Sequence, residues 1–416
     1  MARVITYGTF DLLHYGHIRL LERAKQLGDY LIVGVTSEDF DRRRGKINTH
    51  QSLMERMAAV RALGIADEII VEEYVGQKID DIKRYDIDIF TVGSDWVGKF
   101  DYLKEYCTVI YLPRTEGISS SDIRAGKKDL KIATIGESGV AKKFAKECEY
   151  VNGVCTTDDV ENADAIYVVS MPEDHFKDVR KALLEGKHVI CESPIATKAE
   201  QVKELFALAK NQNLVLMDGL KPAYATAYSR LLLLIKSGAI GDVVSVDATC
   251  TSISDKELQD GMTTGRWNSI CAWGPTALLP IFQILGTEYI DKHITSMYVD
   301  DDKTFDGFTK IDFEYSNAVA SIKVAKTAKS EGSLVITGTK GYVYVPAPWW
   351  KTDYFEIRYE NAEDNKRYFY QLDGEGIRYE IVAFGKTIET DKNFSDVSED
   401  VSVAIADTIE KCMYHM

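Results

Sequence analysis

Short apolar runs alternate with amphipathic stretches along the first 125 residues. The apolar runs predict strands at residues 4–7, 30–35, 68–71, 89–92 and 109–112. Helical spacing of apolar residues predicts helices at 18–27, 51–63 and 78–85; in the first of these, Leu20, Leu21 and Ala24 fall on one face. Strands that alternate with helices at this spacing imply a parallel sheet covered on both faces.

The alternation starts again after a basic, glycine-containing stretch at 124–128. Strands are expected at 130–135, 164–170, 188–191 and 214–218, and helices at 176–184 and 198–212. From about Asp242 the pattern changes to longer strand-like runs at 243–251, 310–315 and 318–324, which predict an open, mostly antiparallel sheet. We therefore divide the chain into three expected domains, 1–127, 128–220 and 221–416.

Composition agrees with this division, because 416 residues are too many for one ordinary domain. The 45% apolar and 28% charged residues are typical of a globular protein, and no apolar window is long enough to predict a membrane span. The first residues enter a strand pattern directly, so no signal peptide is expected. Seven scattered cysteines without a C-x-x-C pair suggest reduced thiols and a cytoplasmic location.

The net charge of −15 argues against nucleic acid and anionic membranes as partners. One short stretch is basic in this acidic chain, because it contains Arg42, Arg43, Arg44 and Lys46. Such a cluster is either a solvated loop or an anion-binding loop. We favour anion binding, because the neighbouring motifs also indicate phosphate.

The strongest of these motifs is Gly8-Thr-Phe-Asp-Leu-Leu-His-Tyr-Gly-His17, directly after the first strand. His14 and His17 fall on one side of a helix start, and Gly16 keeps that side open for a ligand. The free N–H groups of a helix N-terminus favour an anion, so the motif predicts a triphosphate cradle. An isolated H-x-G-H would more often be structural, but its place between strand and helix favours function.

A second motif, from Arg114 to Arg124, follows the last strand of the first domain and contains Ser119, Ser120 and Ser121. Serine capping of a helix would explain one of these residues. The flanking arginines and a second free helix N-terminus favour a second phosphate site.

Residues 1–125 closely resemble the cytidylyltransferase family, and most closely the glycerol-3-phosphate cytidylyltransferases of teichoic acid synthesis. The stretches ITYGTFDLLHYGHIRLLERAKQLGDYL, VGSDWVGKFDYL and VIYLPRTEGISSSDIR carry the resemblance. It implies a Rossmann-like nucleotidyltransferase domain that joins CTP to a glycerol phosphate with Mg²⁺, releasing pyrophosphate and making CDP-glycerol for a teichoic acid or capsule-type polymer. It also implies in-line attack without a covalent enzyme intermediate. We further expect a homodimer.

The resemblance implies roles for individual residues. His14 and His17 would contact the triphosphate, and Lys46 would reach the phosphates. The second phosphate cradle would contain Arg114, Ser119 and Ser120, and the nucleotide cleft would be lined by Thr9, Phe10, Gly16, Asp95 and Trp96. Asp11 would either help to hold magnesium or only orient its loop. The loop at 41–50 departs from the family and is one residue longer, so the glycerol phosphate isomer stays open.

The rest of the chain resembles the glucose–fructose oxidoreductase and inositol dehydrogenase superfamily, over segments 164–172, 185–194, 236–243, 338–349 and 374–380. That family pairs a dinucleotide-binding domain, here expected at 128–220, with an open α/β sheet domain, here expected at 221–416. Its reactive groups are absent, however. Its lysine is replaced by Ser193 in Glu192-Ser-Pro194, and its Asp-x-x-x-His pair aligns with Ala272 and Thr276.

The expected cofactor site also departs from the family. The glycine fingerprint reads Gly136-Glu-Ser-Gly-Val-Ala141, so its middle glycine is Ser138 and Glu137 adds a negative charge. About twenty residues that normally flank the adenosine ribose are missing, together with the acidic residue expected there. We therefore expect a truncated Rossmann domain that binds no NAD(P).

Other polar and aromatic residues have structural explanations. We take His175 as a surface helix start, His188 as a hydrogen-bonded strand residue, and Trp349 and Trp350 as packing. Three hypotheses remain for the second part: an inactive oxidoreductase domain used for dimerisation, stability or partner binding; an NAD(P)-dependent reductase that supplies the polyol phosphate to the first part; or a binding module for a sugar or glycan intermediate.

Overall fold

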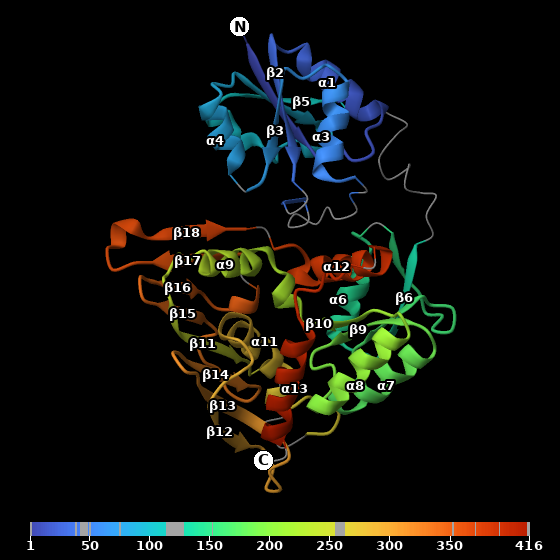
Figure 1. Cartoon of the computed structure of the whole chain (residues 1–416), viewed down its shortest axis with the longest axis vertical. Helices are drawn as coiled ribbons and strands as arrows, with labels where there is room; N and C mark the ends of the chain where they lie inside the picture. Colours follow the sequence, from blue (N-terminus) through green and yellow to red (C-terminus); the bar gives the residue numbers. More distant parts are fainter. Residues whose placement is uncertain are drawn as a thin grey trace. The chain divides into compact units, whose positions relative to one another are not determined.

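The chain folds into two compact units, Met1–Lys128 and Asp129–Met416 (Figure 1). The computed structural model describes residues 2–37, 40–41, 49, 51–74, 76–113, 129–151, 153–253, 263–351, 353–370, 372–390 and 392–413. The stretches 42–48 and 114–128 lie outside the described residues. They include the basic loop, the second serine motif and the stretch where we expect the first domain boundary.

The first unit contains a five-stranded parallel sheet in the order β3-β2-β1-β4-β5. Its strands are β1 (Arg3–Gly8), β2 (Tyr30–Thr36), β3 (Glu68–Glu72), β4 (Ile89–Gly93) and β5 (Thr108–Leu112); its helices are α1 (Tyr15–Lys25), α3 (Leu53–Ala62), α4 (Gln77–Arg84) and the short η1 (Ser94–Trp96) and η2 (Asp101–Glu105). The predicted parallel α/β fold is confirmed. Strand order reverses between β1 and β4, and ligands of open α/β sheets bind where this happens.

Both faces of this sheet are covered, because neighbouring residues of one strand enter different cores. Val4 packs with Leu21 and Val60 from α1 and α3, whereas Ile5 packs with Ile82 of α4 and Phe90 on the opposite face. All six side chains are almost completely buried. Each stabilises the fold by about 1.5–3 kcal/mol relative to an exposed position, so the apolar runs account for the parallel sheet.

The second unit begins with another five-stranded parallel sheet, in the order β10-β9-β8-β6-β7. Its elements are β6 (Leu130–Ile135), α6 (Gly139–Cys148), β7 (Val154–Thr156), β8 (Ala165–Val168), α7 (Pro172–Leu184), β9 (His188–Glu192), α8 (Ala199–Asn211) and β10 (Leu216–Gly219). β7 has only three residues, and no strand pairs with its outer edge among the described residues. This short edge is the truncation expected from the sequence.

An eight-stranded sheet follows, in the order β12-β13-β14-β11-β15-β16-β17-β18. Only β11 and β14 run parallel, so the expected mostly antiparallel sheet is confirmed. The strands are β11 (Val243–Thr251), β12 (Asp291–Tyr298), β13 (Asp306–Glu314), β14 (Val319–Ala325), β15 (Leu334–Gly338), β16 (Tyr342–Val345), β17 (Tyr354–Arg358) and β18 (Lys366–Phe369).

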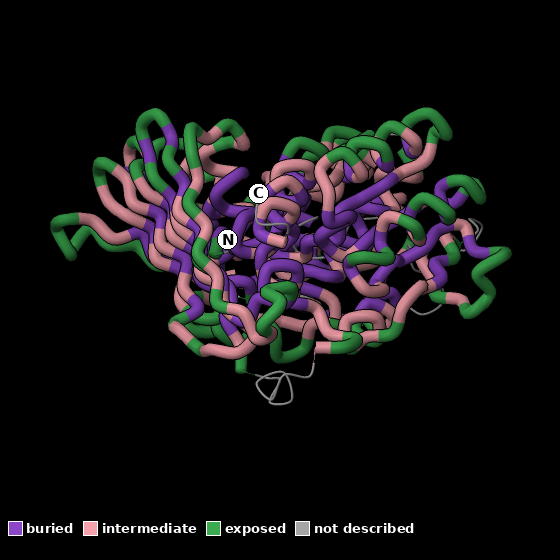
Figure 2. Tube along the Cα trace, turned by 90° about the horizontal axis from the view of Figure 1, so that it is seen from below, coloured by how far each residue is buried: buried purple, intermediate pink, exposed green. Residues whose placement is uncertain are grey.

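Helices cover one face of this sheet and connect it to the parallel sheet (Figure 1). They are α9 (Thr226–Lys236), α11 (Ser269–Leu285), α12 (Ile377–Thr390) and α13 (Glu399–Met413), with the short η3 (Lys221–Tyr224), η4 (Trp349–Lys351), η5 (Ala362–Asp364) and η6 (Asp373–Gly376). α13 contacts both α8 and α11, so it joins the two layers. Figure 2 accordingly shows a continuous buried interior through this unit.

α11 shows why part of the unit was hard to predict. It is apolar around most of its circumference and contains Pro275 and Pro280, which normally interrupt helices. Its burial against β11, β13 and β14 stabilises it despite the prolines.

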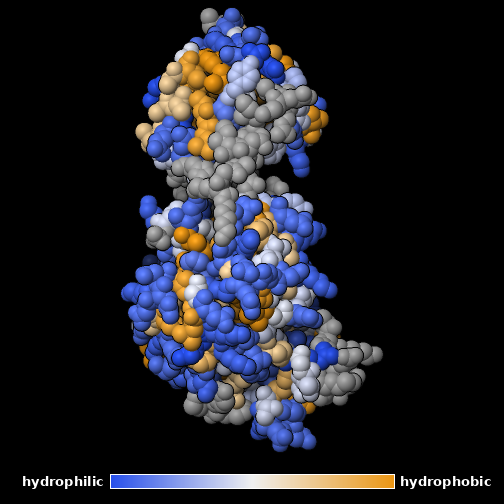
Figure 3. All heavy atoms as spheres, turned by 90° about the vertical axis from the view of Figure 1, so that its right-hand side faces the viewer, coloured by the Kyte–Doolittle hydropathy of each residue, from blue (hydrophilic) through white to orange (hydrophobic). Residues whose placement is uncertain are grey.

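On the face shown in Figure 3 the second unit is mostly hydrophilic, whereas apolar residues gather on the visible face of the first unit.

Three further expectations can be compared with the structure. Among the described residues, no helix combines the length and the apolar character needed to cross a bilayer. All seven cysteines are free thiols, and five of them are buried. Trp349 and Trp350 are also buried, as expected for packing residues.

Candidate active site

The histidine motif lies at the reversal point of the first sheet. Residues 9–17 follow the carboxyl end of β1, and Asp95 and Trp96 form part of η1 after the carboxyl end of β4. β1 and β4 are neighbours in the sheet, so these two loops leave it side by side. Open parallel sheets commonly bind ligands outside the carboxyl ends of their strands. We therefore take these two loops as the candidate site.

His14 and His17 lie together at the start of α1. Their rings are stacked, with centroids 3.9 Å apart and planes inclined by 22°. His14 is the N-cap, and its Nδ1 accepts a hydrogen bond from the Gly16 N–H at 3.1 Å. Neutral His14 therefore carries its proton on Nε2. The pair combines the positive end of a helix with two imidazole rings on one side of it.

Phe10 packs against the His17 ring of this pair. Its backbone is left-handed, with φ of 54°, and its buried ring meets the His17 ring edge-on at 5.5 Å. The ring folds back over Gly8, where a Cβ atom would come within 2.9 Å of it. Gly8 is therefore required by close packing, and Phe10 fixes the orientation of His17.

The remainder of the loop is attached to the start of α3. Gln51 N–H donates to Asp11 Oδ1 at 3.0 Å, and Leu12 N–H donates to Gln51 Oε1 at 2.8 Å. Asp11 is only 4% exposed. One of its oxygens thus has a structural role in orienting the loop, the second of the two roles considered from the sequence.

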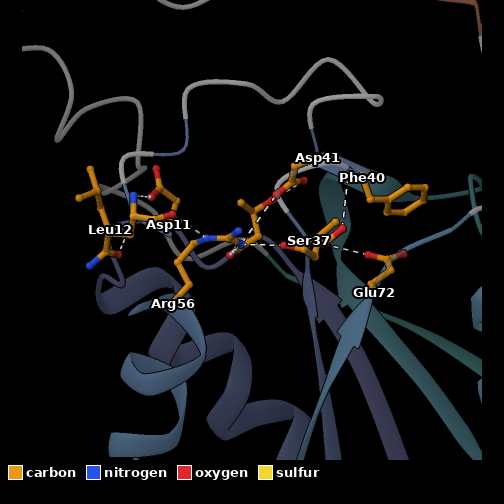
Figure 4. Close-up of polar contacts among 10 residues, drawn as sticks. Asp11, Leu12, Ser37, Phe40, Asp41, Arg56 and Glu72 are labelled. Atoms are coloured by element: carbon orange, nitrogen blue, oxygen red, sulfur yellow. Dashed lines mark hydrogen bonds and ion pairs between the residues drawn. The ribbon is translucent and has the colours of Figure 1, made fainter. Parts of the chain in front are cut away.

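Arg56 is a residue of this site that the sequence analysis missed. Its guanidinium, fully buried, donates from Nη1 to the carbonyls of Thr9 at 2.7 Å and Thr36 at 2.8 Å, and from Nε to the carbonyl of Gln51 at 3.1 Å. Figure 4 shows it reaching from α3 toward Asp41, whose carboxylate lies 3.9 Å away. Arg56 shares the buried side of α3 with Val60, but nothing in the local sequence pattern marks it as buried.

Asp41 completes the link between the loops after β1 and β2. Thr9 Oγ1 donates to Asp41 Oδ1 at 2.9 Å, and Asp41 N–H donates to the Ser37 carbonyl at 2.8 Å. The loops that follow β1 and β2 are therefore held to each other and to α3.

A second polar group lies on the β3 side of the same edge. Lys78 pairs with Glu72, and its ammonium lies 4.5 Å from the Tyr7 ring centroid and 5.5 Å from that of Phe100. The Tyr7 hydroxyl donates to Asp81 at 2.8 Å, and burial, reinforced by this carboxylate, raises the pKa of Tyr7. Trp96 packs on Phe100 at 5.9 Å, so the β4 loop contacts this group.

The remaining predicted residues of the site cannot be placed. Lys46, Arg114, Ser119 and Ser120 lie outside the described residues, as does the arginine cluster at 42–44. Among the described residues, Thr9, Phe10, Asp11, His14, Gly16 and His17 follow β1, and the exposed Asp95 and half-buried Trp96 follow the neighbouring strand β4.

Residues 5–126 match the family described as cytidylyltransferase-like. The chain is 55% identical over 130 residues to a glycerol-3-phosphate cytidylyltransferase of Bacillus spizizenii, a match that covers 31% of this chain and 98% of that protein. A protein of the same name from Staphylococcus aureus is 48% identical over 124 residues, covering 30% and 93%. The chain belongs to the cytidylyltransferase-like family.

The part that follows this cytidylyltransferase-like unit matches a second family. Residues 121–220 match the oxidoreductase family with an NAD-binding Rossmann fold. A 3-ketoreductase from Actinomadura kijaniata, solved with NADP and TDP-benzene, has a TM-score of 0.58 at 15% identity, covering 68% of this chain and 97% of that one. An oxidoreductase from Pseudomonas syringae has the same TM-score at 12% identity, covering 69% and 96%. Both resemblances inferred from the sequence are confirmed, and the structural likeness concerns the fold.

The fingerprint turn of the second unit lies where its strand order reverses, between β6 and β8. Ser138 is the N-cap of α6, and its Oγ accepts the Ala141 N–H at 3.1 Å. Gly136 has φ of 101°, and a Cβ atom there would come within 2.5 Å of the Ser170 nitrogen. The turn after β6 thus packs directly on the turn after β8, and a serine side chain already caps the helix.

Buried carboxyl groups occupy the carboxyl edge of the same sheet. Glu192 ends β9 and accepts a hydrogen bond from the Tyr167 hydroxyl at 2.5 Å, and Asp218 in β10 accepts one from Ser402 at 2.7 Å. Glu380 of α12 is 1% exposed. Burial raises the pKa of all three groups, to about 6 for Asp218, and Lys221 is the cation that opposes the shift for Glu192 and Glu380.

His175 does not lie on the surface, so our expectation for it was wrong. It is fully buried in the first turn of α7, where Nδ1 lies 2.8 Å from the Pro194 carbonyl and Nε2 lies 3.0 Å from the Ser170 carbonyl. Burial lowers its pKa. It joins the loops after β8 and β9. Because Pro194 is distant in the sequence, the pattern of residues around His175 does not reveal this interaction. His188 accepts the Val215 N–H at 3.0 Å, as expected.

We predict that Arg56→Met lowers the free energy of unfolding of the cytidylyltransferase-like unit by about 3–5 kcal/mol, because buried carbonyls and Asp41 lose their cationic partner. Hydrogen exchange of peptides from β1 and α3 measures the loss. Arg61→Met is the matched control, because Arg61 is exposed on the same helix. Equal protection in the two variants would contradict the assigned role of Arg56.

We predict that the stability of the second unit falls as pH rises through about 6. The folded pKa of Asp218 lies above the value of 3.8 for an unperturbed aspartate, so its contribution is complete below pH 4 and is lost as the buried carboxyl ionises. Between pH 5 and pH 8, Asp218→Asn should remove on the order of 1–1.5 kcal/mol of this dependence, because part of the fall takes place below pH 5. Urea unfolding at pH 5 and pH 8, followed by tryptophan fluorescence, tests it. Asp291→Asn, on exposed β12, is the control, and an unchanged pH dependence in Asp218→Asn would refute the prediction.

Proposed function

We propose that the first unit transfers the cytidylyl group of CTP to a glycerol phosphate, giving CDP-glycerol and pyrophosphate. The observation that carries the proposal is the stacked His14–His17 pair at the N-terminus of α1, located at the reversal point of the sheet. Supporting it is the 55% identity to a protein named glycerol-3-phosphate cytidylyltransferase, 98% of whose length is matched.

The proposed reaction is an in-line attack. An oxygen of the glycerol phosphate forms a bond to the α-phosphorus of CTP while the bond to pyrophosphate breaks. The chain supplies positioning and charge neutralisation rather than a covalent intermediate. His14 and His17 would donate hydrogen bonds to phosphate oxygens beside the positive helix end. We propose that Lys46, Arg114, Ser119 and Ser120 provide the other phosphate contacts, and that Thr9, Phe10, Gly16, Asp95 and Trp96 shape the cleft.

Magnesium would accompany the triphosphate. Such an ion takes most ligands from phosphate oxygens and water and needs one or two protein carboxylates. No cluster of three or more potential metal ligands occurs among the described residues, so they contain no cage built from protein groups alone. Asp11 fits the more modest requirement, because it is a carboxylate beside the histidines, fixed by Gln51. The ion would offset negative charge on the phosphates.

The wider setting follows from the same reaction. We propose a cytoplasmic homodimer that supplies CDP-glycerol to a teichoic acid or capsule-type polymer, with neither nucleic acid nor membrane as a partner. The net charge of −15 supports the absence of polyanionic partners. We also propose three domains, 1–127, 128–220 and 221–416, the last two forming the second compact unit.

We propose that the second unit performs no nicotinamide-dependent redox reaction. Moving a hydroxyl proton during hydride transfer needs a titratable group, and Ser193, Ala272 and Thr276 do not titrate near neutral pH. The capped α6 terminus and the short β7 support the same conclusion for the cofactor. The second unit would then be retained for stability, dimerisation or partner binding.

The transferase proposal predicts CTP-dependent pyrophosphate release with a glycerol phosphate and Mg²⁺. His14→Ala and His17→Ala should each lower turnover by at least about 100-fold, since each removes a preorganised donor. The assay compares sn-glycerol 1-phosphate and 3-phosphate with ribitol, ethanolamine and choline phosphates. Exposed His293→Ala, on β12, is the control. Faster turnover of the other three phosphates would refute the substrate assignment, and near-normal turnover in either site variant would refute the site.

The redox proposal predicts no binding of NAD(H) or NADP(H) at micromolar concentrations. Calorimetric titration measures the binding, and absorbance at about 340 nm measures turnover with polyols, sugars and their phosphates. Micromolar affinity together with substrate-dependent turnover would restore the hypothesis of a reductase that supplies the polyol phosphate.

A further inference from the structure

Three lysines from separate elements of the second unit converge on one carboxylate. Lys143 of α6 lies 3.2 Å from both Glu375 oxygens, Lys351 of η4 lies 3.0 Å from Oε1, and Lys221 of η3 lies 3.4 Å from Oε2. Burial opposes ionisation of Glu375, but these ammonium groups outweigh it and lower its pKa to about 2. The three lysines with Glu375 are called the lysine cluster below.

The turn that carries Glu375 is held in an unusual conformation. Gly374, Glu375 and Gly376 all have positive φ, of 59°, 55° and 95°. A Cβ atom at Gly374 would come within 2.4 Å of Glu147, and one at Gly376 within 2.3 Å of the Lys221 carbonyl. The left-handed backbone conformation is unfavourable for a non-glycine residue such as Glu375. The turn is therefore locally strained, and this conformation places the Glu375 carboxylate among the three ammonium groups.

The charges of the cluster do not cancel. Three ammonium groups face the single carboxylate of Glu375, while the neighbouring Glu147 is already paired with Arg378 at 2.9 Å. Glu192 and Glu380 also face Lys221, but burial raises the pKa of both. Each ammonium has more N–H donors than it uses on Glu375. In a chain of net charge −15, this is a local surplus of positive charge with donors still available.

The location also favours a ligand. Lys221 follows the carboxyl end of β10, Lys143 belongs to the helix after β6, and Lys351 comes from the eight-stranded part. The cluster thus lies between the two layers of the second unit, at the carboxyl side of a parallel sheet, where small ligands commonly bind. The side chains of Lys143 and Lys351 are 52% and 38% exposed, so an ion from solvent can reach them.

We propose that Lys143, Lys221 and Lys351 form a binding site for a phosphate group, in which Glu375 holds the ammonium groups together and competes with the incoming anion. A phosphate dianion matches the surplus charge, and converging lysines are common phosphate ligands. All four residues belong to the second unit, and neither the transferase nor the redox proposal depends on this site.

Acetylation of lysines in the full-length protein tests the site residue by residue, with inorganic pyrophosphate as the first probe. Peptide mass spectrometry should show that millimolar pyrophosphate slows acetylation of Lys143 and Lys351 by at least about threefold, because a bound anion stabilises the unreactive ammonium form. Lys203 is the matched control: its side chain is also 52% exposed, and it pairs with Glu200 at 2.7 Å. Equal slowing at Lys203, or none at Lys143 and Lys351, would overturn the proposal.

Variants distinguish a binding site from a purely structural ion-pair cluster. Glu375→Gln should lower the half-protecting pyrophosphate concentration by about tenfold, because one competing charge is removed. Lys143→Gln should abolish the protection of Lys351. Thermal unfolding confirms that each variant is folded, and Glu200→Gln serves as the matched control. A folded Glu375→Gln variant without anion-dependent protection would show that the cluster is structural.

The source of the phosphate group is identified by repeating the measurement with inorganic phosphate, glycerol 3-phosphate and CTP. A small phosphate site should prefer pyrophosphate or inorganic phosphate on charge alone, whereas a site for a nucleotide or a polyol phosphate should be protected at lower concentrations of that compound. The readout is local to Lys143 and Lys351, so it reports protection of these two lysines in particular. Protection by none of the four compounds would reject the proposal.

Discussion

A buried guanidinium holds the active-site loops of the first unit together. Removing an arginine from water is costly, so its position is tolerated only where acceptors converge on it. Arg56 finds them in the carbonyls of Thr9, Thr36 and Gln51, and in the Asp41 carboxylate. These groups belong to the loop after β1, to the end of β2 and the segment that follows it, and to the segment preceding α3. Fixing them fixes the direction in which the chain enters α1, and therefore the position of the histidine pair.

Much of this arrangement could be predicted from the sequence, because apolar periodicity and the position of the H-x-G-H motif are local properties. The strands of the first sheet and the helix start at His14 follow from them directly. Arg56 could not be placed in this way: its partner Thr9 is 47 residues distant, and nothing in the local pattern distinguishes a buried arginine from an exposed one. His175 was misplaced for the same reason, since its partner Pro194 belongs to another loop.

α11 illustrates the opposite limit, where a local rule points away from the structure. Pro275 and Pro280 each remove a helical hydrogen-bond donor, and a run of apolar residues without clear periodicity does not reveal a helix. The helix exists because its sides are buried against the strands β11, β13 and β14 and against α13. Tertiary burial of many apolar side chains thus outweighs propensity, and a single sequence contains no direct record of it.

The two units use the carboxyl edge of a parallel sheet differently. In the first, His14 caps the helix and its ring is stacked on that of His17, and the polar groups behind them are hydrogen-bonded. In the second, Ser138 caps the corresponding helix, and the edge contains Glu192, Asp218 and Glu380 in surroundings that disfavour their charge. Apolar packing maintains a five-stranded parallel sheet in both cases, whereas the chemistry is set by a few side chains after the strand ends. A Rossmann-like fold can therefore persist when the polar groups at its edge have changed, and the function of each unit has to be argued from those groups.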